Sequence, residues 1–181
     1  MAGAAQRLVL AEIEQHRTMP HNIEAEQALL GAILINNAAF YNVSDFLKPD
    51  HFFEPLHTSI FEIASGLIGA NKIATPITIK TFLPANLDIG GLSASQYLAR
   101  LAAEATTVIN AGDYGRTIYD LALRRELINI ADDMRNAAFD ASVDAAPTDQ
   151  IERAEQRLYE AAETGRFGGG FETFDSALSF A

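Results

Sequence analysis

Histidines and carboxylates are the side chains in this sequence that could bind a metal or move a proton. The histidines stand at positions 16, 21, 51 and 57. His51 and His57 are six residues apart, which does not place them on one face of a helix, and the sequence has no HExxH pattern. Glu24 and Glu26 would point to different sides of a helix, so shared acid–base work is not expected. We therefore expect neither a metal site nor a catalytic residue, and we assign the histidines to packing or surface hydrogen bonding.

Nucleotide binding is the second kind of chemistry to consider. The sequence contains no GxxxxGK[ST] loop, which would cradle phosphates. The run Gly168–Gly170 is not followed by Lys-Ser or Lys-Thr, and three consecutive glycines are typical of a hinge. We expect this chain to bind no cofactor and to hydrolyse no ATP.

Two charged features leave more than one interpretation open. Arg124 and Arg125 form a basic doublet that could be a solvated face, with ion pairs to Glu126 or Asp120, or could contact an acidic partner helix. The segment 149–163 carries an acidic row. It could likewise be a solvated face or could contact a basic partner; its members are Asp149, Glu152, Glu155, Glu160 and Glu163.

The composition narrows the class of protein. The 181 residues suit one compact domain with a tail, and 49% of them are hydrophobic. The absence of cysteine excludes disulfides, thiolate metal sites and a cysteine nucleophile, and it is compatible with the cytoplasm, where we place the protein. The net charge is −11, and there are only three lysines, too few for a surface that tracks nucleic-acid phosphates. A protein partner fits this composition better than DNA or a membrane.

The first 19 residues do not read as an export signal. The apolar run Leu8–Ala11 is too short and leads directly into Glu12 and Glu14. No stretch approaches the roughly 18 apolar residues of a membrane span. We expect residues 1–19 to be a flexible N-terminal extension.

Residues 20–112 carry the start and stop signals of several short helices. Asn22 is a suitable N-cap for a first helix, in which Gly31 predicts the close approach of another helix. Pro55 and the pair Thr75-Pro76 open later helices, and Ser93–Gln96 is a capping box. We therefore expect a helical head.

The same residues give little support to a β-sheet. No segment alternates with a period of two for long enough to predict a strand. The β-branched run Ile77–Ile79 is the one place where that expectation could fail.

Residues 113–164 read as a helical hairpin. The segment of about 113–139 is expected to form either one long helix or two nearly collinear helices. The segment Ala145–Pro147 interrupts it, and Thr148 or Asp149 caps a last helix to about Glu163. Residues 165–181 read as a hinge followed by the start of a linker helix, and we expect proteases to cut first near Gly168–Gly170.

The long helix carries two apolar stripes on opposite sides. One contains Tyr119, Leu123, Leu127, Ile130 and Met134, and the other contains Tyr114, Ile118, Leu121, Ile128 and Phe139. One globular surface can cover only one of them. The second helix can offer only an apolar face made of Ile151, Ala154, Leu158 and Ala161–Ala162.

The uncovered stripe is buried either elsewhere in this chain or against another chain. Under the second interpretation, the hairpin supplies a candidate protein interface. Its residues are Leu121, Arg124, Arg125, Ile128, Phe139, Ile151 and Leu158.

An ordered series of motifs points to a known family. The series consists of Pro20–Gln27 with Leu30-Gly31, Asp50–Phe53, His57–Phe61, Gly90-Gly91 with Tyr97-Leu98, Tyr114, Arg124–Ile128 and Ala154-Glu155. Together these segments resemble the N-terminal domain of DnaB-type replicative DNA helicases over about residues 20–165. The ordered series is far more specific than any one of its motifs.

The resemblance implies an all-α domain, a globular head followed by a hairpin. In that family such domains pair through their hairpins and form a collar on a hexameric ring. The collar receives the primase and takes part in regulating loading, so a helicase loader is a further possible partner. ATP and Mg²⁺ are expected only in the family's ATPase domain, which lies beyond the linker. By this resemblance the chain is not itself an enzyme, and its parent is an ATP-dependent DNA helicase.

Two alternatives belong to other classes of protein. One is the helicase-binding domain of a primase, which shares a similar helical fold. The other is a small acidic enzyme whose site has no recognisable motif. The signature Glu24–Gly31 argues against the primase.

Overall fold

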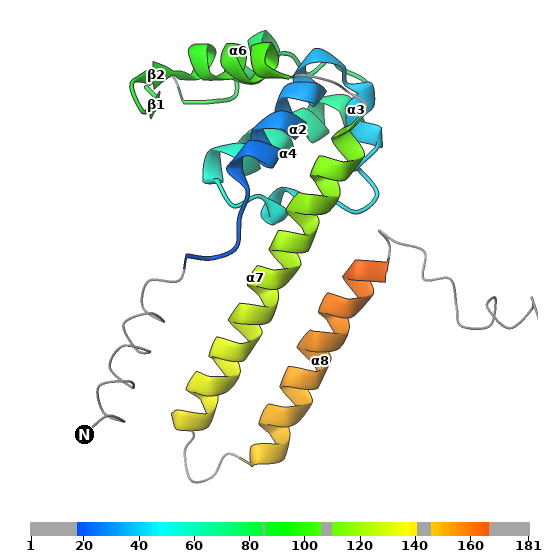
Figure 1. The fold of residues 1–181 in the computed structure, drawn as a ribbon, viewed down its shortest axis with the longest axis vertical. Coiled ribbons are helices and arrows are strands. Elements are labelled where there is room, and N and C mark those ends of the chain that lie inside the picture. The colour runs from blue at the N-terminus through cyan, green and yellow to red at the C-terminus, as the bar shows by residue number, and fades with distance from the viewer. Residues whose placement is uncertain (1–17, 85, 106–109, 141–145, 167–181) are drawn as a thin grey trace, which may run out of the picture.

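The computed structural model describes residues 18–84, 86–105, 110–140 and 146–166. Over these residues the chain is predominantly helical, which confirms the expected all-α class (Figure 1). The expected extension, residues 1–19, lies outside the described residues except for Thr18 and Met19. The elements, in order, are α2 (Ile23–Ile35), α3 (Ala38–Tyr41), η1 (Pro49–His51), α4 (Pro55–Gly69), α5 (Pro76–Lys80), β1 (Asp88–Ile89), β2 (Leu92–Ser93), α6 (Ala94–Glu104), α7 (Ala111–Phe139) and α8 (Pro147–Arg166).

The helix starts in the head follow the local signals of the sequence. The Asn22 side chain accepts a hydrogen bond from the Ala25 N–H at 3.0 Å and caps α2. Thr75 and Ser93 form capping boxes at the starts of α5 and α6. Pro55 occupies the first turn of α4, where its missing N–H costs no hydrogen bond. These starts were predicted correctly because a cap involves only residues within a few positions of each other.

Helix α2 is the centre of the head. Its middle, Leu29–Leu34, is buried on every side by α4, α6 and α7 (Figure 1). Gly31 permits this packing, since a Cβ there would collide with the backbone carbonyl of Leu101 in α6. The predicted close approach of a helix over Gly31 is therefore confirmed.

The expectation of no strand was wrong at one small hairpin. Strands β1 and β2 pair antiparallel, with Ile89 opposite Leu92. Gly90 and Gly91 form the turn, with φ values of +58° and +86°, in the left-handed region that residues with a side chain rarely adopt. The Asp88 carboxylate accepts a hydrogen bond from the Gly91 N–H at 2.8 Å. Strands of two residues are too short to show alternation. The run Ile77–Ile79, considered as a possible strand, is helical.

Helices α7 and α8 run antiparallel beside each other and extend away from the head (Figure 1). Helix α7 is one continuous helix that begins at Ala111, and α8 begins with Pro147 at its first position. Gly165 lies inside α8, which continues past the point where we expected the hinge to begin. Residues 167–181 lie outside the described residues. None of the described helices is long and apolar enough to cross a membrane.

Candidate functional site

The first half of α7 is part of the head. Ile118 and Tyr119, one from each predicted stripe, are both buried there. Gly115 lies so close to Val43 that a Cβ at this position would collide with the valine side chain. Farther along, Leu127 of one stripe is 46% exposed and Phe139 of the other is 84% exposed. The stripes therefore do not divide into one covered and one free side: the head covers both at one end and leaves both partly open at the other.

Arg125 fixes α7 to the head. Its guanidinium donates to the Pro20 carbonyl at 2.8 Å and to the His51 carbonyl at 2.6 Å, and it lies over the Phe53 ring at 5.8 Å. Burial lowers the pKa of Arg125, and the nearby Glu26 carboxylate partly offsets this. Of the predicted basic doublet, Arg125 thus binds carbonyl oxygens within its own chain rather than Glu126 or Asp120, while Arg124 is exposed.

Arg157 holds α8 against α7. Its guanidinium donates to Asp133 at 2.6 Å and to Glu126 at 2.9 Å, and these two carboxylates raise the pKa of Arg157. Ala154 of α8 and Ile130 of α7 are buried beneath this contact. Gln150 of α8 also donates to the Ala137 carbonyl of α7 at 3.0 Å. Among the described residues, a bridging cation, this hydrogen bond and a narrow apolar contact therefore join the hairpin.

An apolar groove lies between the two helices beyond this bridge. Its volume is about 400 Å³, and its apolar lining includes Ile130, Met134, Ala138, Pro147 and Ile151. Met134 remains 48% exposed and Ile151 56% exposed, so neither is covered by the opposite helix. Ile151 and Ala154 both belong to the face that was expected to cover α7; of the two, only Ala154 is buried there.

The candidate interface residues are distributed over several surfaces. Arg125 is turned toward the head, and Leu121 is half-buried. Ile128 is 36% exposed, Leu158 43% exposed and Phe139 84% exposed. The structure therefore leaves apolar side chains available on both helices of the hairpin but does not gather all seven residues into one patch.

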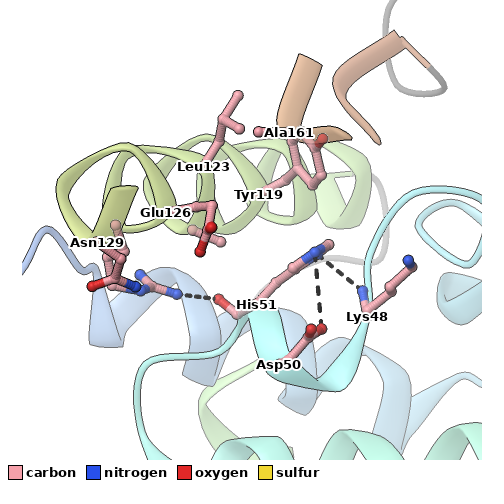
Figure 2. Close-up of a pocket in the computed structure, with 10 residues that line it drawn as sticks. Lys48, Asp50, His51, Tyr119, Leu123, Glu126, Asn129 and Ala161 are labelled. Carbon is pink, nitrogen blue, oxygen red and sulfur yellow. Dashed lines mark hydrogen bonds and ion pairs between the residues drawn. The ribbon is translucent and has the colours of Figure 1, made fainter. Parts of the chain in front are cut away.

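A second cleft, of about 300 Å³, lies where η1 meets α7 and α8. In Figure 2, Lys48, Asp50 and His51 of the head face residues of α7, with Ala161 of α8 above them. The Nδ1 atom of His51 accepts from the Lys48 N–H at 3.1 Å, and burial lowers the pKa of His51. The Tyr119 ring packs edge-on against His51, and the Tyr119 hydroxyl has no hydrogen-bond partner among the described residues. Burial raises the pKa of Tyr119.

A buried polar network lies deeper in the head. The Glu26 carboxylate accepts from the Phe53 N–H at 2.7 Å, from the Glu54 N–H at 3.3 Å and from His57 Nδ1 at 2.7 Å. The Nε2 atom of His57 lies 2.6 Å from the Tyr97 hydroxyl. Glu26 is 1% exposed and His57 0% exposed. This network joins α2, α4 and α6 at the centre of the head.

The hydrogen bonds of this network are consistent with one arrangement of protons. Gln27 donates to the Tyr97 oxygen at 3.2 Å, so the Tyr97 hydroxyl is free to donate to His57 Nε2. His57 then carries its proton on Nδ1 and donates it to Glu26. Burial raises the pKa of Tyr97, which keeps the hydroxyl in its donating form. Every member of the chain from Gln27 to Glu26 has a partner, as a buried polar network requires.

Sequence reasoning missed this network. We considered Glu26 only as a possible partner of Glu24, and we assigned His57 to packing or surface hydrogen bonding. Glu26 and His57 are 31 positions apart, and His57 and Tyr97 are 40 apart, so no local pattern connects them. All three nevertheless lie inside the motifs that carried the family resemblance. Those motifs thus contain residues that hold the head together.

No group of three or more His, Asp or Glu side chains that could hold a metal ion occurs within the described ranges. The arrangement of charged groups is instead one of internal clamps: Arg125 to the head, Arg157 across the hairpin, and Glu26 within the core.

Comparisons with known proteins agree with the geometry. Residues 18–120 match the family described as the DnaB-like helicase N-terminal domain. The chain is 45% identical over 149 residues to the replicative DNA helicase DnaB of Rickettsia typhi, covering 82% of this chain and 30% of that protein. It is 32% identical over 154 residues to DnaB of Pasteurella multocida, covering 83% of this chain and 32% of that protein. The chain thus spans about a third of the length of these curated relatives.

A solved structure of the same family has a similar fold. The crystal structure of the N-terminal domain of DnaB helicase from Mycobacterium tuberculosis superposes with a TM-score of 0.70 at 26% identity, over 79% of this chain and 99% of that one. The matches favour the helicase over the primase module, the alternative left open by the sequence. The chain belongs to the family of DnaB-like helicase N-terminal domains.

Proposed function

We propose that this chain is a non-catalytic collar domain of a replicative helicase, which associates with copies of itself through the hairpin α7–α8 and offers the primase a docking surface there. A helicase loader is a second partner of this kind. The ATP and Mg²⁺ needed for unwinding belong to another part of such a helicase. The membership in the DnaB-like family supports the replicative role, and the exposed side chains of the hairpin support the self-association.

The observation that carries the proposal is the presence of uncovered apolar side chains on both helices of the hairpin. Phe139, Ile151 and Leu158 are 84%, 56% and 43% exposed, and Ile128 is 36% exposed. Fully burying a large apolar side chain is worth about 1.5–3 kcal/mol, so covering several of them would stabilise a pair of hairpins. The open groove beside Ile151 adds a concave apolar surface to the same region.

The charge of the domain supports a protein partner rather than DNA. The chain has 24 acidic and 13 basic residues. Of the basic residues, Arg125 and Arg157 are occupied by contacts within the chain. Binding to DNA phosphates would need a cluster of free cationic side chains.

The test replaces an exposed side chain of the hairpin and measures association. We expect Ile128→Asp and Ile151→Asp to shift the domain toward the monomer in sedimentation equilibrium and to weaken primase binding, with the helical circular dichroism unchanged. Tyr41→Asp is the control, since Tyr41 is 63% exposed on the head.

Two outcomes would contradict the proposal. If Ile128→Asp unfolds the domain, this part of α7 is internal core. If both hairpin variants associate and bind primase as the parent chain does, the hairpin is not the interface.

A further inference from the structure

The region around α5 differs from the rest of the chain in both charge and exposed apolar surface. Residues 63–87 contain no Asp or Glu, although the whole chain carries 24 of them. Two of its three lysines, Lys72 and Lys80, lie in this segment. The segment is thus locally cationic in a chain of net charge −11.

The same segment exposes large apolar side chains. Ile73 is 70% exposed, Ile77 80% and Phe82 61%. Three such side chains within ten consecutive residues are unusual on the surface of a domain that buries its core well, because exposed apolar side chains normally occur singly. Both lysines lie beside these side chains, Lys72 directly before Ile73 and Lys80 one helical turn after Ile77.

These side chains are exposed on a fixed backbone. The Asn37 side chain donates to the Ala74 carbonyl at 2.8 Å and accepts from the Ala74 N–H at 2.9 Å, which holds the residue next to Ile73. Ile79 is fully buried and Thr75 caps α5, so Ile77 is held on the outer side of an anchored helix. A surface that is already ordered loses little conformational entropy when a partner binds.

We propose that α5 and its flanks, residues 72–82, form a docking surface for a partner protein, and that the partner supplies a segment combining aliphatic or aromatic side chains with carboxylates. The partner's apolar side chains would cover Ile73, Ile77 and Phe82. Its carboxylates would pair with Lys72 and Lys80. This surface is separate from the hairpin surface and extends the proposed function with a second type of partner.

The chemistry of the surface distinguishes this partner from a nucleic acid. Two lysines give a weak attraction to phosphates, and a phosphate backbone would leave three apolar side chains uncovered or set against charge. An acidic peptide with apolar side chains matches both features of the surface, because opposite charges flank a contact that excludes water.

The experiment measures binding of a fluorescein-labelled peptide of Asp-Phe-Glu-Leu repeats to the whole chain by fluorescence anisotropy. We expect saturable binding that the double variant Lys72→Glu/Lys80→Glu weakens by about tenfold or more, and that Ile77→Ser weakens to a similar degree. Leu127→Ser, which changes an exposed leucine of α7 outside both proposed interfaces, should bind as the parent chain does. A Lys-Phe-Lys-Leu peptide and an Asp-Ser-Glu-Ser peptide should each bind much more weakly than the probe.

Several results would overturn the proposal. It fails if the probe does not bind, or if the head variants bind it as tightly as the parent chain does. Displacement of the probe by a single-stranded oligonucleotide or by anionic vesicles would assign the surface to that ligand. Loss of self-association in Ile77→Ser would assign it to a second copy of this chain. Since Ile77→Ser and Ile128→Asp test different surfaces, failure here leaves the proposal for the hairpin standing.

Discussion

The head and the hairpin are built from helices of similar kind, but they bury their side chains in different ways. In the head, α2 is surrounded by other helices, and even a carboxylate and an imidazole are taken fully out of water with all their partners in place. In the described part of the hairpin, Ile130 and Ala154 are buried between α7 and α8, and a partly exposed arginine, Arg157, bridges the two helices. The head therefore supplies most of the stability, and the hairpin keeps apolar surface for contacts outside the chain.

The largest expected effect tests the head. Glu26→Ala removes the acceptor of two backbone N–H groups and of His57, all in a buried site. Breaking a buried charged network by removing one partner costs about 3–5 kcal/mol, so the urea midpoint should fall sharply or the head should unfold. Glu24→Ala, in the same turn but exposed, is the control and should change the free energy of unfolding by less than about 0.5 kcal/mol. Equal losses in the two variants would mean that the network contributes nothing special.

The second prediction uses one substitution at two sites of the head. Gly31→Ala places a Cβ against the Leu101 carbonyl and should cost about 1–3 kcal/mol, because α2 and α6 must move apart. Gly66→Ala lies in α4 with open space around it and should instead stabilise the domain by about 0.5–1 kcal/mol through helix propensity. Urea unfolding of both variants checks the opposite signs. If the Gly31→Ala variant were more stable than the parent chain, α2 and α6 would not need to pack as closely as they do at Gly31.

The smallest expected effect concerns the hairpin. Arg157→Met removes the bridge to Glu126 and Asp133, and amide hydrogens of α8 should then exchange faster while those of α2 and α4 keep their rates. Because the bridge is exposed, high salt should accelerate exchange in α8 of the parent chain as well. Arg153→Met, one turn earlier on α8, is the matched control. Faster exchange throughout the head would mean that the head and the hairpin unfold together and that α8 does not open independently.

The sequence predicted those parts of the fold that depend on neighbouring residues. Caps at Asn22, Thr75 and Ser93, prolines in first turns and the close contact at Gly31 all act within a few positions or through the absence of one side chain. The ordered motifs predicted the family. The hairpin β1–β2 was missed because two residues cannot show alternation.

The contacts of the candidate site join residues that are far apart in the sequence, so the sequence predicted them less well. Arg125 binds the carbonyl of Pro20, 105 positions away, and its neighbour Arg124 has an equivalent sequence environment, so spacing could not tell which of them turns inward. The apolar faces of the hairpin were identified, but not which members touch. Of the predicted face of α8, Ala154 is buried against α7, whereas Ile151 and Leu158 remain exposed, and the bridge made by Arg157 was not foreseen. Helix periodicity gives the direction of a side chain and leaves the partner helix free to rotate or slide.

The contacts of Arg125 make α7 a lever whose N-terminal half is embedded in the head. From Arg125 to Phe139 the helix rises about 20 Å at about 1.5 Å per residue, without a break in its helical hydrogen bonding. A turn of the head by about 10° would then carry the tip of α7 through roughly 4 Å, since the embedded end cannot absorb the motion. A protein bound near Phe139 could therefore detect, or impose, the orientation of a head it never touches.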